Sequence, residues 1–434
     1  MEKQAMQGIR KNAEKRPRQN SIRTLAEKNR DYIIERRRYY HSHPELSLME
    51  FATTASIKQD LEKIAQSSGV KNLAITTFSD YPGLVADFDS GRPGRTILLR
   101  ADIDALPIHE CTGLSFSSQN PGVMHACGHD THIAMLLGAV KILLSPRIRH
   151  RLRGKLRIIF QSGEETACGA KYYIDHGLLD DVDAVFGLHT WGTLDAPYIC
   201  VDSGRRMAST DNFVIRIMGE KAHGAAPHLG HDAIVAASAA VMALQSFVSR
   251  ENNPVNPLVL TVGKFHGGNM RNTICGETEL DGTIRTFSKE LQDRLKDEIT
   301  NIVSSTVKAY GCTAEVEMKY MHPSLVNDDE ELNGIARRAA LKLYGPEGIR
   351  SRECVMSGED FSLYTEKVPG FFAFVGARNE KRGMTHSNHH EGFAPDESTL
   401  ERGSAFTAQF ALDYLLHSIE GDDTNAINRQ SKKL

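Results

Sequence analysis

Residues 156–165 read LRIIFQSGEE, an apolar run that ends in two adjacent carboxylates. The run 156–161 predicts a buried strand, and residues 131–144 before it show the apolar periodicity of a helix. Further short strands are expected at 84–88, 96–99 and 184–188. This alternation of strands and helices predicts an α/β fold with a mainly parallel sheet.

A second, smaller domain is expected where the pattern changes, near Ser209. Its elements follow the order β-α-β-β-α-β, which predicts a ferredoxin-like sandwich over residues 209–319. The expected strands are 212–218, 258–264, 277–285 and 313–319, and the expected helices are 232–248 and 289–309. The α/β pattern then returns, so the small domain is predicted to be an insertion into a larger one made of residues 28–208 and 320–418.

Both ends of the chain are polar. Residues 1–27 are predicted to form a basic extension without the apolar core of a signal peptide, because seven Lys or Arg fall within the first 23 residues. The pattern of residues 21–41 predicts one amphipathic helix. A polar, frayed tail is expected at 419–434.

Composition excludes several classes of protein. The net charge of −3 gives no support for a nucleic-acid partner. No stretch approaches the ~20 apolar residues of a membrane span. The seven cysteines are odd in number and widely spaced, which predicts reduced thiols and a cytoplasmic protein.

The densest group of reactive side chains is the segment 124–132, MHACGHDTH, which directly precedes a helix. Cys127 and His129 are separated only by Gly128, and a turn there would bring both side chains to one point. Thiolate and imidazole are good ligands for zinc and related metals. The segment is therefore predicted to bind metal, and the alternative is a helix-capping loop with incidental histidines.

Other candidate ligands follow the expected strands. Glu164 and Glu165 lie where open α/β sheets place their ligands, so one could bind metal while the other takes a proton from bound water. His189 also ends a strand, although a buried core histidine is the alternative. Asp102 and Asp104 point to one face of their strand and could ligate metal or orient a ligand histidine. Two metal ions ~3.5–4 Å apart would polarise a carbonyl and lower the pKa of bound water.

These motifs resemble, in the same order, those of the amidohydrolase branch of the dinuclear metallopeptidases. That branch contains hippurate hydrolase, the plant auxin-conjugate hydrolases and N-acetyl-diaminopimelate deacetylase. The resemblance runs from residue 32 to residue 415, with motifs at 36–46, 100–107, 125–130, 160–165, 219–223, 272–285 and 358–361.

The resemblance implies a role for each matching residue. Cys127 would bridge two divalent metal ions, and the other ligands would be His129, Glu165, His189 and His389. Glu164 would act as general base and then as acid. His223 would reach the active site of a partner subunit in a homodimer formed through the small domain, and would stabilise the oxyanion. Asn272 and Arg285 would grip the substrate carboxylate, although the residues alone also allow a turn residue and a structural ion pair.

The sequence departs from this family in two places that matter. Ser162-Gly163 stands where relatives usually have Pro-Ala, which should loosen the turn before the two carboxylates. The late loop holds His386, His389 and His390, and His389 is chosen because it best matches the His-x-x-x-Phe of the family.

The sequence therefore predicts an enzyme that hydrolyses the amide bond of N-acyl or aroyl amino acids with two divalent ions. Zinc or manganese fits the ligands best, and cobalt or nickel is also compatible. One alternative is a dipeptidase or aminopeptidase, which would recognise a free α-amino group. Another is a metal-binding scaffold without catalysis, which the presence of Glu164 argues against.

Overall fold

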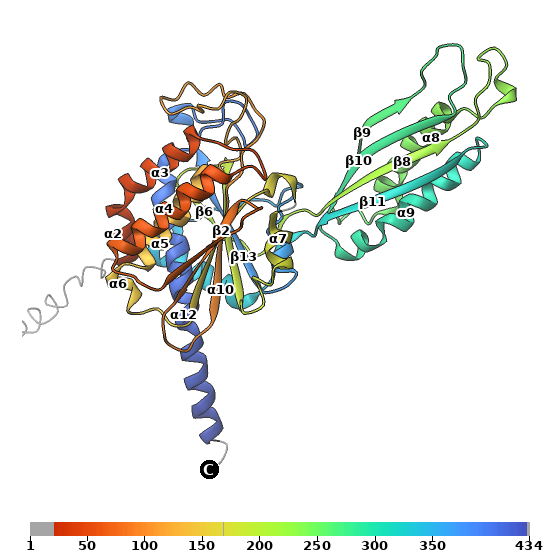
Figure 1. The fold of residues 1–434 in the computed structure, drawn as a ribbon. Helices are drawn as coiled ribbons and strands as arrows, with labels where there is room; N and C mark the ends of the chain where they lie inside the picture. The colour runs from red at the N-terminus through yellow and green to blue at the C-terminus, as the bar shows by residue number, and fades with distance from the viewer. Residues whose placement is uncertain (1–20, 168, 432–434) are drawn as a thin grey trace, which may run out of the picture.

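The computed structural model describes residues 21–167 and 169–431, with side chains up to residue 417 in the last helix. Figure 1 shows two domains, a rounded larger one and an elongated smaller one at its side, which extended chain segments connect. The fold is of the α/β class, as the sequence predicts. The predicted extension lies largely in residues 1–20, outside the described residues.

The large domain contains, among the described residues, a seven-stranded sheet of order β1-β2-β4-β3-β5-β13-β6. Its four central strands are mutually parallel: β4 (Lys155–Gln161), β3 (Thr96–Asp102), β5 (Ala184–Asp195) and β13 (Gly370–Arg378). The antiparallel strands lie toward the edges: β1 (Leu73–Thr77), β2 (Gly83–Asp89) and β6 (Ile199–Cys200). Asp102 pairs with Gln161, so the segments that follow β3 and β4 emerge side by side.

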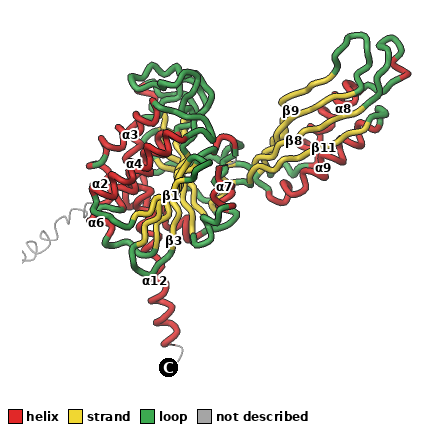
Figure 2. Tube along the Cα trace, in the orientation of Figure 1, coloured by secondary structure: helices red, strands yellow, loops and turns green. Residues whose placement is uncertain are grey.

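Helices cover both faces of this sheet, because successive side chains of its central strands are apolar and point to opposite faces. Ile97 and Leu99 of β3 point to one face, and Leu98 points to the other. The first face is covered by α2 (Ser21–Lys28), α3 (Arg30–Ser42), α4 (Phe51–Ser67), α5 (His129–Leu143), α10 (Glu330–Tyr344) and α12 (Leu400–Ser431). The second is covered by α7 (Gly169–Asp175) and α11 (Ser362–Thr365). Figure 2 shows the strands between these helices.

The small domain, called the lid below, has the predicted β-α-β-β-α-β order. Its elements are β8 (Thr210–Met218), α8 (Ala233–Ser246), β9 (Leu258–Gly267), β10 (Glu277–Thr286), α9 (Lys289–Lys308) and β11 (Thr313–His322). The antiparallel sheet has the order β11-β8-β10-β9. Phe213, Ile215 and Ile217 of β8 are buried in the core that α8 and α9 share with the sheet. A two-stranded sheet of β7 (Gly204–Met207) and β12 (Leu325–Asn327) lies where the chain enters and leaves the lid.

The predictions for the two ends need correction. The single helix expected over 21–41 is two helices, α2 and α3, separated at Asn29. Residues up to 27 are not all an extension, because Ile22 and Ala26 of α2 are 1% and 2% exposed in the large domain's core. At the other end, the backbone of α12 stays helical to Ser431, well into the region predicted as a frayed tail. Local polarity does not reveal that α2 packs against α12.

One prediction about apolar stretches also needs correction. Ala233–Glu251, which is α8 and the π-helical turn after it, is by length and composition apolar enough to cross a membrane. The side chains of Ala236, Ala240 and Leu244 are buried against the lid sheet, which accounts for much of that apolar character. On the other side of α8, Val235 is 49% exposed and Met242 is 71% exposed.

Candidate active site

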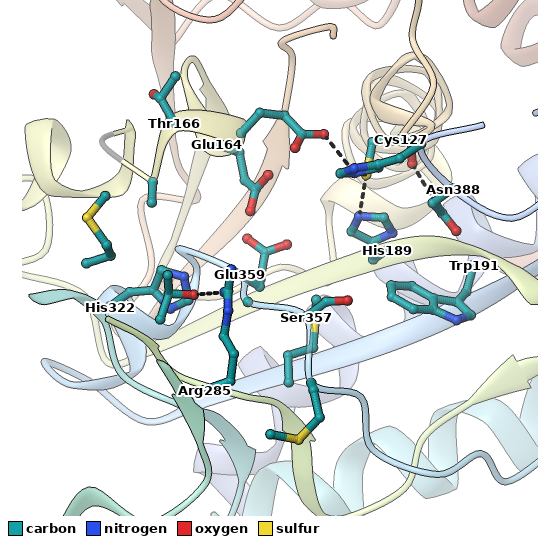
Figure 3. A pocket seen from close by; sticks show the side chains of 18 of the residues that line it. Cys127, Glu164, Thr166, His189, Trp191, Arg285, His322, Ser357, Glu359 and Asn388 are labelled. Carbon is teal, nitrogen blue, oxygen red and sulfur yellow. Dashed lines mark hydrogen bonds and ion pairs between the residues drawn. The ribbon is translucent and has the colours of Figure 1, made fainter. Parts of the chain in front are cut away.

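Five candidate ligands from four segments meet at the carboxyl ends of the parallel strands. Figure 3 labels two of them, Cys127 and His189. The Sγ atom of Cys127 lies 3.5 Å from Nε2 of His189 and 3.2 Å from Nε2 of His389. Oε1 of Glu165 lies 3.4 Å from Nε2 of His389 and 3.9 Å from Nε2 of His129. The structure therefore places all five predicted ligands around a common centre.

The turn before α5 directs Cys127 and His129 toward this centre. Gly128 has φ +92°, a left-handed conformation that favours glycine, and α5 begins at the next residue. A Cβ atom at Gly128 would lie 3.3 Å from the ring of Phe393, so a side chain would also crowd the loop that carries His389. The turn thus needs glycine for its conformation and for close contact.

Hydrogen bonds fix the orientation of the imidazole rings. Nδ1 of His129 lies 3.1 Å from Asp104, and Nδ1 of His189 lies 2.8 Å from the Thr190 carbonyl oxygen, so in both rings Nε2 faces the centre. His132 is different, because its Nε2 accepts the Thr190 N–H and its Nδ1 bonds to Asp102 at 2.5 Å. Both predicted aspartates therefore orient histidines: Asp104 orients the candidate ligand His129, and Asp102 orients its neighbour His132.

The donor atoms suit two cations that share Cys127. Cys127, His129 and His189 offer ligand atoms within 4.8 Å of one another, and so do Cys127, Glu165 and His389. Nε2 of His129 and Oε1 of Glu165 are buried, and neither has a hydrogen-bond partner among the described residues. Burial and the nearby Glu165 raise the pKa of the Cys127 thiol, so bound cations would be needed to keep it ionised. Sulfur and nitrogen donors of this kind are typical zinc ligands.

Glu164 lies beside this centre, among other carboxylates. Oxygen atoms of Glu164, Glu359 and Asp360 lie within 4.8 Å of one another. Burial and the neighbouring Glu359 raise the pKa of Glu164, which favours a group that can accept and return a proton. Burial also raises the pKa of Glu359 to about 8.

Arg100 partly neutralises this carboxylate cluster. Its guanidinium bonds to Asp102 at 2.7 Å, to Asp360 at 2.8 Å and to Glu359 at 3.1 Å. The sequence predicted no role for Arg100, Glu359 or Asp360, although they lie in the family motifs 100–107 and 358–361. Their position in those motifs was the only available signal.

The centre opens into a cleft of 860 Å³ between the two domains. The lid and the chain segments that connect it contribute Thr210, Asn212, Arg285 and His322 to the lining. Apolar parts of the wall come from Trp191, Met207, Met321 and Met356. Figure 3 shows Arg285 across the cleft from Cys127 and His189, with its side chain directed toward Glu359. The cleft thus has a metal-binding wall, a cationic group and apolar surface.

The sequence model of the peptidase family M20/M25/M40 matches residues 98–413. The chain belongs to this family. Among curated proteins, the N-acetyl-L-cysteine deacetylase of Bacillus subtilis is 39% identical over 379 residues, which is 87% of each chain. Thermostable carboxypeptidase 1 of Saccharolobus solfataricus is 35% identical over 88% of this chain and 95% of its own.

A solved structure has the same fold as this M20 peptidase. It is a dinuclear metal-binding peptidase of the M20 family from Bacillus subtilis, with a TM-score of 0.78 and 34% sequence identity. The match covers 90% of this chain and 99% of the other. The donor set around Cys127 is consistent with the dinuclear metal binding of that relative.

Two predicted residues of this M20 peptidase lie away from its own cleft. His223 and Asn272 are exposed neighbours, because the N–H of Gly224 bonds to the Asn272 carbonyl oxygen at 2.7 Å. They adjoin the Met218 end of β8, whereas Thr210, at the other end, lines the cleft. At about 3.4 Å per residue of an antiparallel strand, β8 separates these ends by about 27 Å. The expectation that Asn272 and Arg285 grip one carboxylate together therefore fails within a single chain.

The late histidine loop agrees with the choice of His389, whereas the Ser162-Gly163 turn differs from its prediction. His386 and His390 stack on each other with ring centroids 3.9 Å apart, and of the three histidines only His389 is placed beside Cys127. The turn expected to be loose is held instead, because Ser162 and Gly163 both donate hydrogen bonds to Glu50. The contact with Glu50 cannot be seen in local sequence, because Glu50 is 112 positions from Ser162.

Proposed function

We propose that this M20 peptidase hydrolyses the amide bond of N-acyl or aroyl amino acids and releases a carboxylic acid and a free amino acid. The observation that carries the proposal is the placement of Glu164 next to the Cys127 donor set, with Arg285 in the same cleft. Two divalent ions, zinc or manganese with cobalt or nickel as alternatives, would supply a polarised carbonyl and an activated water when bound. The name of the deacetylase relative supports amide hydrolysis on this substrate class.

Glu164 would take the proton of the attacking water and pass it to the leaving amine. Its raised pKa, which burial and Glu359 produce, suits a carboxylate that must hold that proton between the two steps. Arg100 bonds to Asp102 and Asp360 and holds these two carboxylates in place beside Glu164. The roles of acid and base thus fall to one residue.

Arg285 is proposed to bind the α-carboxylate of the substrate. Its guanidinium is half-buried in the cleft and is oriented by a hydrogen bond from Nη1 to Oγ1 of Thr210. A planar guanidinium can hold a carboxylate with two parallel hydrogen bonds. The position of Arg285 would set the length of the substrate between carboxylate and scissile amide.

We expect the Arg285→Lys variant to raise KM for N-acyl amino acids by about 10- to 100-fold, with a smaller change in kcat. Lysine keeps the charge but loses the fork that matches a carboxylate. Steady-state kinetics on one substrate, and on its α-carboxamide analogue, would check this. Replacing the carboxylate of the substrate by a carboxamide should lower kcat/KM more in wild type than in the variant. If kcat/KM falls by the same factor in both proteins, Arg285 does not bind the carboxylate.

A second copy of the chain is proposed to complete the site. His223 and Asn272 are exposed on the lid, about 27 Å from the end of β8 that lines the cleft. β9 is an edge strand of the lid sheet with seven exposed residues, and the adjoining α8 exposes Val235 and Met242. Such an edge favours pairing with another copy. His223 of the partner subunit would then stabilise the oxyanion, and Asn272 of the partner subunit would contact the substrate.

A substrate panel tests the proposed reaction most simply. Metal-loaded enzyme should release free amino acid from N-acetyl and N-benzoyl amino acids, and an unacylated dipeptide should be a much poorer substrate. The carboxypeptidase relative makes the dipeptide the necessary comparison. Strict dependence on a free α-amino group would favour the dipeptidase, and metal binding without turnover on any amide would favour a scaffold.

We also place the enzyme in the cytoplasm. Among the described residues, Cys111, Cys127, Cys200, Cys275, Cys312 and Cys354 are all free thiols. Unpaired cysteines are typical of proteins in reducing compartments.

A further inference from the structure

The turn that carries Glu164 is fastened by a carboxyl group from a distant part of the chain. Glu50, the residue before α4, is fully buried, and its Oε2 accepts a hydrogen bond from Oγ of Ser162 at 2.5 Å. Its Oε1 accepts the N–H of Gly163 at 3.0 Å. We propose that Glu50 is a positioning residue that fixes the direction of Glu164 through these two bonds. The proposal rests on the proposed role of Glu164 as general base.

The backbone of this turn needs an external anchor. β4 ends at Gln161, and the next residues leave the hydrogen-bond ladder. Gly163 has φ +74° and Ala167 has φ +53°, and a short 3₁₀ turn, Glu164–Thr166, lies between them. Rotation at Gly163, which has no side chain to restrain it, would swing the Glu164 carboxylate away from the Cys127 centre.

Glu50 can serve as that anchor because it is itself held to the sheet. Its carbonyl oxygen accepts hydrogen bonds from N of Thr54 at 2.9 Å and from Oγ1 of Thr54 at 2.6 Å. Oγ1 of Thr54 accepts the N–H of Gly83 at 2.6 Å. Gly83 pairs with Gln161, the last residue of β4. The contacts thus form a closed ring from the end of β4, through β2 and Glu50, back to the turn.

Glu50 acts at a distance from the substrate. It is not among the residues that line the cleft, so its removal should leave substrate contacts in place. Glu45 offers a matched control in the same segment. Its carboxyl group bonds to N of Thr53 at 2.7 Å and to Oγ1 of Thr53 at 2.8 Å, at the start of α4 rather than at the turn.

The test compares four variants: Ser162→Ala, Glu50→Ala, Glu50→Gln and the control Glu45→Ala. We expect kcat on an N-acyl amino acid to fall by about 100-fold in Glu50→Ala, because a displacement of about 1 Å in a catalytic group costs about that factor. In Ser162→Ala, which keeps the Gly163 bond, we expect a fall of about 10-fold. KM should stay within about twofold. Glu50→Gln should keep kcat within about threefold, because the amide oxygen can accept the Gly163 N–H and the amide nitrogen can donate to the Ser162 hydroxyl.

Two further measurements separate positioning from general damage. Metal content per chain and the unfolding midpoint of metal-free protein should be as in wild type for Ser162→Ala. The double variant Glu50→Ala/Ser162→Ala should have the same kcat as Glu50→Ala. The reason is that Glu50→Ala already removes the Glu50–Ser162 hydrogen bond that Ser162→Ala removes. Glu45→Ala should keep wild-type kcat.

Three results would overturn the proposal. These are a Ser162→Ala variant with wild-type kcat, a Glu50→Gln variant as slow as Glu50→Ala, or a loss of activity that lost metal or unfolding accounts for entirely. A Glu164→Gln variant assayed in parallel keeps the two ideas distinct. Wild-type kcat in that variant would reject the general base itself, whereas a slow Glu164→Gln beside unaffected Glu50 and Ser162 variants would reject only the positioning role.

Discussion

Replacing Glu164 by glutamine is expected to lower kcat by about 10²- to 10⁴-fold, the usual contribution of a general acid–base group. Glutamine fills the same space beside Glu359, but it cannot take a proton from water or give one to the leaving amine. KM should change little, because Glu164 is not proposed to bind substrate. The measurement is steady-state hydrolysis of an N-acyl amino acid by fully metal-loaded enzyme.

The control for Glu164→Gln is its metal content. Because Cys127, His129, Glu165, His189 and His389 are untouched, the variant should hold as many ions per chain as wild type. Full activity with full metal content would contradict the assignment of Glu164. Low activity with lost metal would show instead that the residue acts as a ligand.

Replacing His223 by alanine is expected to lower kcat by about 10²- to 10³-fold, as the loss of one oxyanion donor does. His223 lies on the lid, far from the cleft of its own chain, so it is proposed to act in the site of the partner subunit. Mixing the His223→Ala and Glu164→Gln proteins should therefore restore activity. Random exchange of subunits should give about a quarter of wild-type activity, because half the dimers are mixed and each contains one complete site.

The contradicting outcome for His223 is equally clear. If the mixture is no more active than its components after proven subunit exchange, His223 does not act in the partner's site. A His223→Ala protein that is fully active as a monomer would reject both the residue and the dimer as parts of the catalytic unit.

Sequence reasoning succeeded where the signal is local. The strand 156–161 and the lid helices follow apolar periodicity, and the structure places them within a few residues of the predicted bounds. The candidate ligands Cys127 and His129 were also visible, since a glycine between two residues of ligand type is a local pattern. These features depend on neighbours along the chain.

Long-range contacts explain what the sequence missed. Arg100 bonds to Asp360, which is 260 positions away, and Glu50 bonds to Ser162, which is 112 positions away. The separation of Asn272 from Arg285 depends on the direction in which β10 crosses the lid, because the two residues are only a strand apart in sequence. The burial of α2 depends on α12, at the other end of the chain. Such contacts exist only once the sheet has formed.

Turnover as a function of bound metal tests the two-metal hydrolase most directly. Protein stripped by a chelator should not hydrolyse N-acyl amino acids. Added zinc or manganese should restore turnover until about two ions are bound per chain, the number expected for a shared-ligand centre. With the same added metal, the Cys127→Ala variant should recover almost no turnover. Full turnover in metal-free protein, or a Cys127→Ala variant that recovers wild-type turnover, would contradict the account.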